Sequence, residues 1–215
     1  EVRLRCAPTP EELAAMGFDA VIAALGSGAV LPDIPGMRDA EGRPLLRTCH
    51  DVIGRQETLG SDVIMVGCSE TGIETACYLA ENGHNVTCLT RQDVLAKDAS
   101  PLHSITIAWD RPRHPVTGEA YLAPYWERFE DRLTGVTGAT TVSVTPTSVT
   151  YVDRDGASHT IQADQVIVCG GVEPDLDGAL KYAACAPMFR MVGDVDSNAD
   201  MAHAFRSGFM AASQI

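Results

Sequence analysis

The chain has 215 residues, of which 45% are hydrophobic and 21% charged, proportions typical of a globular protein. Its formal net charge of −13 argues against a nucleic-acid-binding surface. No apolar run approaches the roughly 20 residues of a membrane-spanning helix, so we expect neither a nucleic-acid partner nor a membrane.

The cysteines and histidines argue against a redox motif or a metal site. None of the seven cysteines belongs to a C-x-x-C pair, and the six histidines show no metal-ligand spacing. Several cysteines lie in apolar patterns, where a free thiol behaves as a small hydrophobic side chain. We interpret them as free thiols of a cytoplasmic protein. His84 follows a predicted helix stop at Gly83, and we expect it in a surface turn.

The N-terminal part predicts an alternating segment, a short helix and a buried strand. Residues 2–6 alternate like a strand, and Thr9-Pro10-Glu11-Glu12 combines an N-cap, a first-turn proline and acids at a helix start. Residues 18–24 form an apolar strand that ends in Leu25-Gly26-Ser27-Gly28. A loop follows at residues 31–36.

Residues 61–91 predict a strand, a glycine turn, a helix and a second strand. The turn is Gly67-Cys68-Ser69-Glu70-Thr71-Gly72, the helix covers residues 73–81, and strand character returns at residues 86–89. This is the context that a dinucleotide fingerprint requires. Gly67 permits the sharp turn, Gly72 lets the helix pack close to the strand, and the helix N-terminus presents N–H groups to a pyrophosphate. Ser69 stands where the middle glycine usually lies, and we interpret residues 67–72 as a phosphate-binding turn.

Thr90 and Arg91 follow the second strand, where NAD-preferring proteins usually carry an acid on the ribose hydroxyls. No carboxylate here repels a 2′-phosphate, and one guanidinium lies nearby. The sequence therefore favours NADP(H) over NAD(H). The alternative is that Arg91 is a solvated loop charge.

The middle of the second half predicts a helix and an antiparallel meander. Residues 125–133 look helical, and residues 140–151 and 158–161 look like strands separated by a turn at residues 153–156. We expect the meander to span about residues 142–161.

The end of the chain predicts two further strands and a helix. Residues 163–169 form an apolar strand led by an aspartate, and they end in Gly170-Gly171. Residues 189–192 run into Gly193-Asp194, and residues 201–214 form a helix rich in small residues.

Four motifs in this order resemble those of flavoproteins with two dinucleotide-binding domains. They are residues 19–27 followed by Pro32 and Ile34-Pro35-Gly36, the glycine turn, residues 169–174, and Val192-Gly193-Asp194 followed by Ala204-Phe205 and residues 208–212. Residues 77–87 and 94–103 are similar to one branch, the NADH:flavin oxidoreductase family. That family includes 2,4-dienoyl-CoA reductase, trimethylamine dehydrogenase and bile-acid-type enone reductases. The resemblance covers essentially the whole chain.

The resemblance implies that this chain is the C-terminal piece of a longer polypeptide. Residues 1–58 would be a partial FAD-binding subdomain without its first βαβ unit, residues 59–168 the NAD(P)H-binding subdomain, and residues 169–215 the return to the FAD-binding subdomain. The site residues that it implies beyond the turn are Gly26, Ser27, Gly170, Gly171, Gly193, Asp194 and Ala204. It places Asp194 near the flavin ribityl chain, and the alternative is that Asp194 is a helix N-cap.

The expected fold is α/β: a Rossmann-like three-layer dinucleotide-binding fold with a parallel sheet, helices on both of its faces, and an antiparallel β-meander. The resemblance implies that the chain positions NAD(P)H for hydride transfer to FAD. Electrons would then pass to an N-terminal flavin barrel, with FMN and an iron–sulfur cluster, that reduces an enone or similar small molecule.

Three further expectations follow from the resemblance. The FAD site is incomplete in this segment, and no residue is a convincing general acid or nucleophile, so we expect the segment alone to be inactive. Its partners would be the barrel of the same chain and a small-molecule substrate, and a homo-oligomer is compatible with the sequence.

A competing hypothesis is a degenerate Rossmann domain that binds no nucleotide and serves as a structural or docking module. Three departures from the family pattern keep this hypothesis open: Ser69, Thr90, and Ala29, which stands where the first motif usually has proline.

Overall fold

The computed structural model describes residues 1–97, 123–197 and 201–215, and the chain divides into two compact units. Unit 1 contains Glu1–Gly28 and Val172–Ile215, and unit 2 contains Ala29–Gly171. The predicted subdomain boundaries, near residues 58 and 168, separate FAD-binding from NAD(P)H-binding segments. That division stays a prediction.

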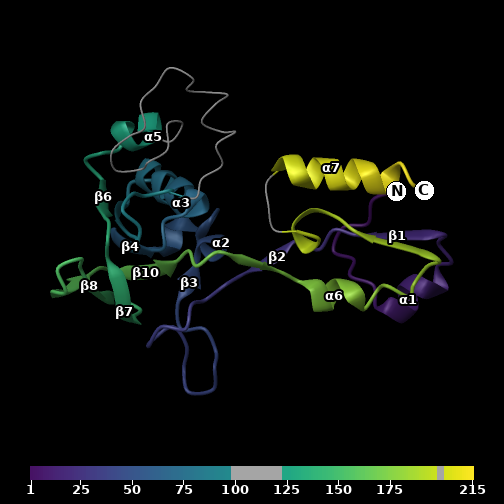
Figure 1. Cartoon of the computed structure of the whole chain (residues 1–215), viewed down its shortest axis with the longest axis horizontal. Helices are drawn as coiled ribbons and strands as arrows, with labels where there is room; N and C mark the ends of the chain where they lie inside the picture. Colours follow the sequence, from purple (N-terminus) through teal and green to yellow (C-terminus); the bar gives the residue numbers. More distant parts are fainter. Residues whose placement is uncertain (98–122, 198–200) are drawn as a thin grey trace. The chain divides into compact units, whose positions relative to one another are not determined.

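Unit 2 is built around a five-stranded parallel sheet (Figure 1). In spatial order the strands are β3 (Arg47–Thr48), β10 (Gln165–Val168), β4 (Asp62–Val66), β5 (Asn85–Leu89) and β6 (Leu133–Val136). All four neighbouring pairs run parallel. The central strands are apolar on both sides because both faces of the sheet are covered, which is usual for parallel sheets.

Helices cover one face of this sheet. They are α2 (Cys49–Val52), the 3-10 turn η1 (Gln56–Thr58), α3 (Glu70–Glu81) and α5 (Ala123–Arg128). Ile73 and Leu79 of α3 are fully buried in one hydrophobic cluster with Val63 and Met65 of β4. Trp126 of α5 belongs to the same cluster. This packing holds the start of α3 close to the end of β4. Among the described residues, no helix is both long and apolar enough to cross a membrane.

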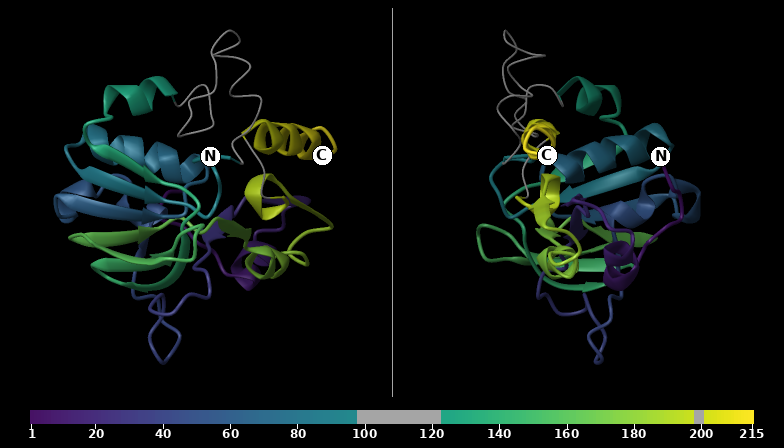
Figure 2. Two further views of the ribbon diagram at one scale, coloured as in Figure 1. Left: turned by 60° about the vertical axis from the view of Figure 1, so that its left-hand side comes forward. Right: turned by 90° about the vertical axis from the view of Figure 1, so that its right-hand side faces the viewer.

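An antiparallel meander covers the other face (Figure 2). Its strands are β7 (Thr140–Thr145), β8 (Ser148–Val152) and β9 (Ser158–Gln162). Val144 and Val149 of the meander share a second hydrophobic cluster with Ile64 and Val166 of the parallel sheet. The predicted α/β class, parallel sheet and meander are confirmed. The prediction of helices on both faces is wrong for unit 2, because an antiparallel sheet with one apolar face covers the second side.

Unit 1 contains a two-stranded parallel sheet and several short elements. They are α1 (Pro10–Ala15), β1 (Ala20–Ala23), β11 (Val172–Pro174), α6 (Leu176–Leu180), β12 (Met188–Met191), the 3-10 turn η2 (Gly193–Val195) and α7 (Met201–Ala212). Strand β1 pairs with β12. Strand β2 (Ser27–Ala29) pairs with β11 where the chain passes from one unit to the other. Thr9 is the N-cap residue of α1, as the sequence predicts, and it also forms a capping box with Glu12.

Several predicted bounds differ from the structure. Residues 2–6 form no strand, and Val2 and Leu4 are each 84% exposed, so their alternation reflects no packed face. The helix predicted over residues 125–133 ends at Arg128, and α3 begins at Glu70 rather than residue 73. The strand predicted over residues 140–151 is interrupted by a turn at residues 146–147, which makes it β7 and β8.

The expectation that His84 lies in a surface turn is wrong. Its side chain is only 9% exposed, and its Nδ1 lies 2.8 Å from the carbonyl oxygen of Gly60. The backbone N–H of His84 also donates to the carbonyl of Leu79. The imidazole therefore joins the loop before β4 to the loop after α3.

Shortening Leu79 to alanine should weaken unit 2 more than a change on the exposed side of the same helix. Leu79 is fully buried, and truncating such a leucine typically costs about 2–5 kcal/mol. Urea denaturation, followed through the fluorescence of buried Trp126, measures this loss in a Trp109→Phe background. Glu81→Ala is the control and should change the free energy of unfolding by less than about 0.5 kcal/mol. Equal effects of the two changes would contradict the packing described.

Candidate functional site

The carboxyl ends of β4, β5 and β10 meet at one edge of the parallel sheet. Val66 ends β4 opposite Leu89 of β5 on one side and Val168 of β10 on the other. The chain continues from β4 to β5 and β6 on one side, whereas β10 lies on the opposite side of β4. Such a reversal of strand order is a topological switch point, where open α/β sheets bind ligands.

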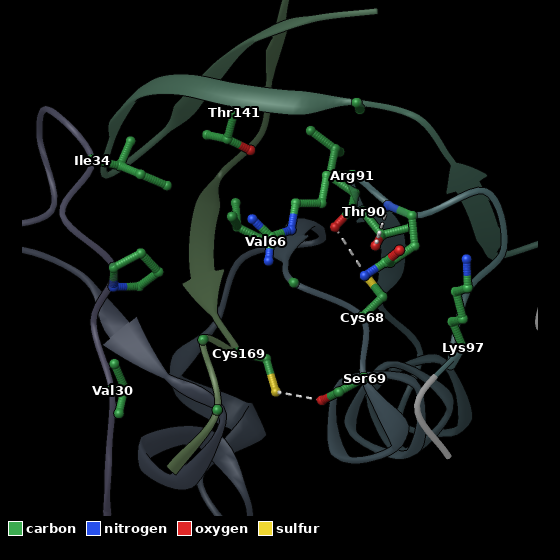
Figure 3. A pocket seen from close by; sticks show the side chains of 17 residues that line it. Val30, Ile34, Val66, Cys68, Ser69, Thr90, Arg91, Lys97, Thr141 and Cys169 are labelled. Atoms are coloured by element: carbon green, nitrogen blue, oxygen red, sulfur yellow. Dashed lines mark hydrogen bonds between the residues drawn. The ribbon is translucent and has the colours of Figure 1, made fainter. Parts of the chain in front are cut away.

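A cavity of about 520 Å³ lies at this edge and is shown in Figure 3. Its size falls in the range of roughly 300–1,000 Å³ typical of small-molecule and cofactor pockets. Seven of the residues predicted from the sequence line it: Gly67, Cys68, Ser69, Thr90, Arg91, Gly170 and Gly171. The structure thus brings together three segments that are far apart in the chain. Their role in binding stays a prediction.

The glycine turn is shaped by two close backbone contacts. Gly67 has a φ of +89°, and a Cβ on it would collide with the carbonyl oxygen of Cys169. A Cβ on Gly72 would lie 2.6 Å from the carbonyl oxygen of Gly67. The N–H of Gly67 donates to the carbonyl of Leu89 at 3.0 Å, which ties the turn to β5. Both glycines therefore have the steric roles that the sequence predicts.

Helix α3 begins at the edge of the cavity. Ser69 is its N-cap residue, and its side chain makes no capping hydrogen bond. The Ser69 hydroxyl instead lies 3.8 Å from the Sγ of Cys169. Glu70, Thr71 and Gly72 form the first turn but do not line the cavity. A helix N-terminus offers N–H groups and a positive dipole end to an anion, so this position suits a phosphate.

Thr90 and Arg91 form another side of the cavity, opposite Val30 and Ile34 (Figure 3). Thr90 is 7% exposed, and its Oγ1 accepts a hydrogen bond from the N–H of Gln92 at 3.2 Å. The Arg91 guanidinium has no hydrogen-bond or ion-pair partner among the residues that the structure describes. It is therefore available to an anionic ligand.

Lys97 contributes a second cation to this side of the cavity (Figure 3). Its Nζ pairs with Asp93 Oδ1 at 2.7 Å, and this hydrogen bond lowers the pKa of the exposed Asp93 carboxyl. Lys97 is thus already partly neutralised by a protein carboxylate, unlike Arg91.

The Cys68 thiol points into the protein rather than to a ligand. Its Sγ donates to the carbonyl of Leu89 at 3.4 Å, and burial raises its pKa well above the ordinary value for cysteine. Cys68 is therefore a neutral thiol, and only the backbone at this position is suited to contact a cofactor.

Unit 1 has its own cavity, of about 440 Å³. Four predicted residues line it: Gly26, Gly193, Asp194 and Ala204. Ser27 lies in β2 and does not line it. Val192, not Asp194, is the N-cap residue of η2, which removes the structural alternative for Asp194 at this turn. That Asp194 contacts flavin stays a prediction.

Several lining residues are not predictable from the sequence. Pro32 and Ile34 belong to the predicted loop at residues 31–36, Val30 precedes it, and Ala139 and Thr141 lie at the start of β7. Lys97 could be predicted to line the cavity, because it is a cation shortly after the second strand of the βαβ unit. Within the described ranges, no group of His, Cys, Asp or Glu side chains is placed to hold a metal ion.

Comparison with known proteins agrees with this architecture. Residues 2–197 match the family model described as pyridine nucleotide-disulphide oxidoreductase. The chain is 26% identical over 220 residues to NADH oxidase of Thermoanaerobacter brockii, covering 100% of this chain and 31% of that protein. It is also 26% identical to bilirubin reductase of Mediterraneibacter gnavus (strain CC55_001C), covering 99% of this chain and 30% of the relative.

A solved structure of 2-naphthoyl-CoA reductase in complex with 2-naphthoyl-CoA has the same fold. It superimposes with a TM-score of 0.83 at 22% identity, over 99% of this chain and 29% of the other. The chain therefore spans about 30% of the length of the relatives that it matches. The family resemblance inferred from the sequence is confirmed.

Gly67→Ala should destabilise unit 2 more than Gly83→Ala. Both glycines have a positive φ, +89° and +95°, which costs an L-residue about 1–2 kcal/mol. A Cβ at position 83 meets nothing within 4 Å, whereas one at position 67 meets the Cys169 carbonyl. The difference between the two losses in chemical denaturation therefore measures the close contact. Equal losses would show that the turn does not depend on it.

Proposed function

This chain belongs to the pyridine nucleotide-disulphide oxidoreductase family, and we propose that unit 2 binds NAD(P)H at the carboxyl ends of β4, β5 and β10. The observation that supports this most strongly is the glycine turn. Gly67 and Gly72 bring the start of α3 to the edge of a cavity that is large enough for part of a dinucleotide.

The residues of unit 2 suit the different parts of this ligand. The N–H groups at the start of α3 would bind the pyrophosphate, since the helix dipole favours negative charge there. Ser69 has a φ of −67°, so its backbone needs no glycine to form the turn. Thr90 and Arg91 would contact the adenosine ribose and its substituent. When bound, NAD(P)H supplies a hydride, and the protein contributes position and electrostatics.

In unit 1 we propose that Gly26, Gly193, Asp194 and Ala204 contribute to a flavin site. They line one cavity, and Gly26 and Gly193 have φ values of +76° and +69° that favour glycine. Gly193 is further fixed by its N–H, which donates to the Ser207 hydroxyl at 2.9 Å. A flavin bound there would be the acceptor for the hydride. The small residues would leave room for it, and Asp194 would offer hydrogen-bond acceptors.

For the whole protein we propose a multidomain flavin reductase in which this module oxidises NAD(P)H. Electrons would pass to an N-terminal flavin barrel, with FMN and an iron–sulfur cluster, that reduces an enone or a similar small molecule. Relatives of about three times the length support this proposal, and two of them are an NADH oxidase and a bilirubin reductase.

We propose NADP(H) rather than NAD(H) as the preferred nucleotide. The position after β5 carries Thr90 instead of an acid, so nothing there repels a 2′-phosphate. Arg91 lines the cavity beside it with no competing carboxylate among the described residues. A guanidinium and a phosphate form strong, often bidentate hydrogen bonds.

Arg91→Ala should weaken NADPH binding much more than NADH binding. A hydrogen bond to a charged group contributes about 1.5–3 kcal/mol, which is roughly ten- to a hundredfold in affinity. Isothermal titration calorimetry with each nucleotide measures the two affinities. Arg55→Ala removes an exposed cation of unit 2 that does not line the cavity, and it should leave both unchanged. Equal losses for both nucleotides on Arg91→Ala would contradict the proposed preference.

Thr90→Glu should shift the preference in the opposite direction. A carboxylate at the end of β5 would repel the 2′-phosphate and accept hydrogen bonds from the ribose hydroxyls of NADH. The ratio of NADH to NADPH affinity should therefore rise, as measured by the same titration. If neither the native chain nor this variant binds either nucleotide, the docking-module hypothesis replaces the proposed function.

A further inference from the structure

Two cysteines that are distant in the sequence are brought together beneath the glycine turn. Strands β3 and β10 pair in parallel, with Arg47 opposite Ile167 and Thr48 opposite Val168. The next residue on each chain is a cysteine, Cys49 and Cys169. Neighbouring strands lie about 4.8 Å apart, and disulfides span Cα separations of roughly 4.4–6.8 Å. The register therefore places this pair at a distance that a disulfide can bridge.

The two thiols also lie on the same side of the sheet. Cys49 and Cys169 are 4% and 6% exposed and belong to the hydrophobic cluster on the α3 side. Each thiol shifts the pKa of the other, in opposite directions, so the two sulfurs lie within range of each other. All seven cysteines are free thiols in this structure.

We propose that Cys49 and Cys169 form a reversible disulfide, and that this pair makes the site sensitive to small peroxides. The sequence does not indicate this pair, because the C-x-x-C pattern concerns only cysteines that are close in the chain. Here the parallel pairing of β3 with β10 supplies the proximity instead.

The difference in acidity between the two thiols decides which sulfur reacts first. Interaction with the Cys169 thiol lowers the pKa of Cys49 to about 6, and the nearby His50 lowers it further. Interaction with Cys49 and burial raise the pKa of Cys169. Cys49 is therefore the thiolate, the form that attacks oxidants.

The reaction with hydrogen peroxide is balanced within this pair. The Cys49 thiolate attacks one peroxide oxygen, which forms a sulfenic acid and releases hydroxide. The Cys169 sulfur then attacks the Cys49 sulfur, its proton leaves with the sulfenic oxygen as water, and the disulfide forms. In sum, two thiols and one peroxide give one disulfide and two water molecules.

The location of Cys169 couples this reaction to the cavity. Cys169 lines the cavity, and its Sγ lies 3.8 Å from the Ser69 hydroxyl at the start of α3 (Figure 3). A disulfide would turn that sulfur towards Cys49 and away from Ser69. If unit 2 binds NADPH as proposed, the bound nucleotide would cover Cys169 and slow the reaction of the pair with peroxide.

Tryptic mapping identifies the disulfide without ambiguity. Cleavage after arginine and lysine leaves Cys49 alone in residues 48–55 and Cys169 alone in residues 155–181, whereas Cys68, Cys77 and Cys88 share residues 56–91. The whole chain is treated with hydrogen peroxide, its remaining thiols are alkylated, and it is digested without reductant. We expect residues 48–55 linked to residues 155–181, and dithiothreitol should separate them. No link, or a link that involves residues 56–91, would overturn the proposal.

Single substitutions test whether Cys49 and Cys169 form the disulfide, and added NADPH tests whether the pair is coupled to the cavity. Cys49→Ser and Cys169→Ser should each abolish the link, whereas Cys77→Ser, an equally buried thiol of the same cluster, should preserve it. NADPH at saturating concentration should slow link formation at least severalfold. If NADPH does not bind, the link should still form at its full rate, and only the proposed function fails. If NADPH binds and the rate is unchanged, the coupling of the pair to the cavity is overturned.

Discussion

The close contact between Gly67 and the Cys169 carbonyl is the constraint on which the site depends. A side chain at position 67 would push apart the ends of β4 and β10, because its Cβ would occupy the space of that carbonyl oxygen. The contact brings the glycine turn, the start of α3 and the Gly170-Gly171 segment to one edge of the sheet. The cavity arises there because the backbones approach without side chains between them.

Hydrogen bonds between backbone groups make this edge rigid. Cys169 N–H donates to the Val66 carbonyl at 2.8 Å, and Gly67 N–H donates to the Leu89 carbonyl at 3.0 Å. Ala139 N–H donates to the Thr90 carbonyl at 2.9 Å, which fixes the segment that carries Arg91. Groups held by a scaffold of this kind lose little conformational entropy when a ligand binds, so a preformed site binds more tightly.

Much of unit 2 was predictable because its signals are local. Gly67, Ser69 and Gly72 lie within one turn, and the apolar run before them and the helix after them identify the βαβ unit. The remainder depends on contacts between distant segments. Nothing near Ala139 indicates that it borders the cavity, and nothing near Cys49 indicates that it adjoins Cys169. His84 was misassigned for a similar reason, since its partner Gly60 lies on a different loop.

Hydrogen–deuterium exchange of the chain with and without NADPH tests the central claim, that the carboxyl ends of β4, β5 and β10 form a nucleotide site. Bound NADPH should slow amide exchange in residues 67–73, 90–92 and 169–171, because these N–H groups lie in the glycine turn and in the segments that follow β5 and β10 around the cavity. Exchange in β9 (Ser158–Gln162), on the meander, should not change. Protection of the meander alone, or unchanged exchange at the three strand ends under saturating NADPH, would contradict the account.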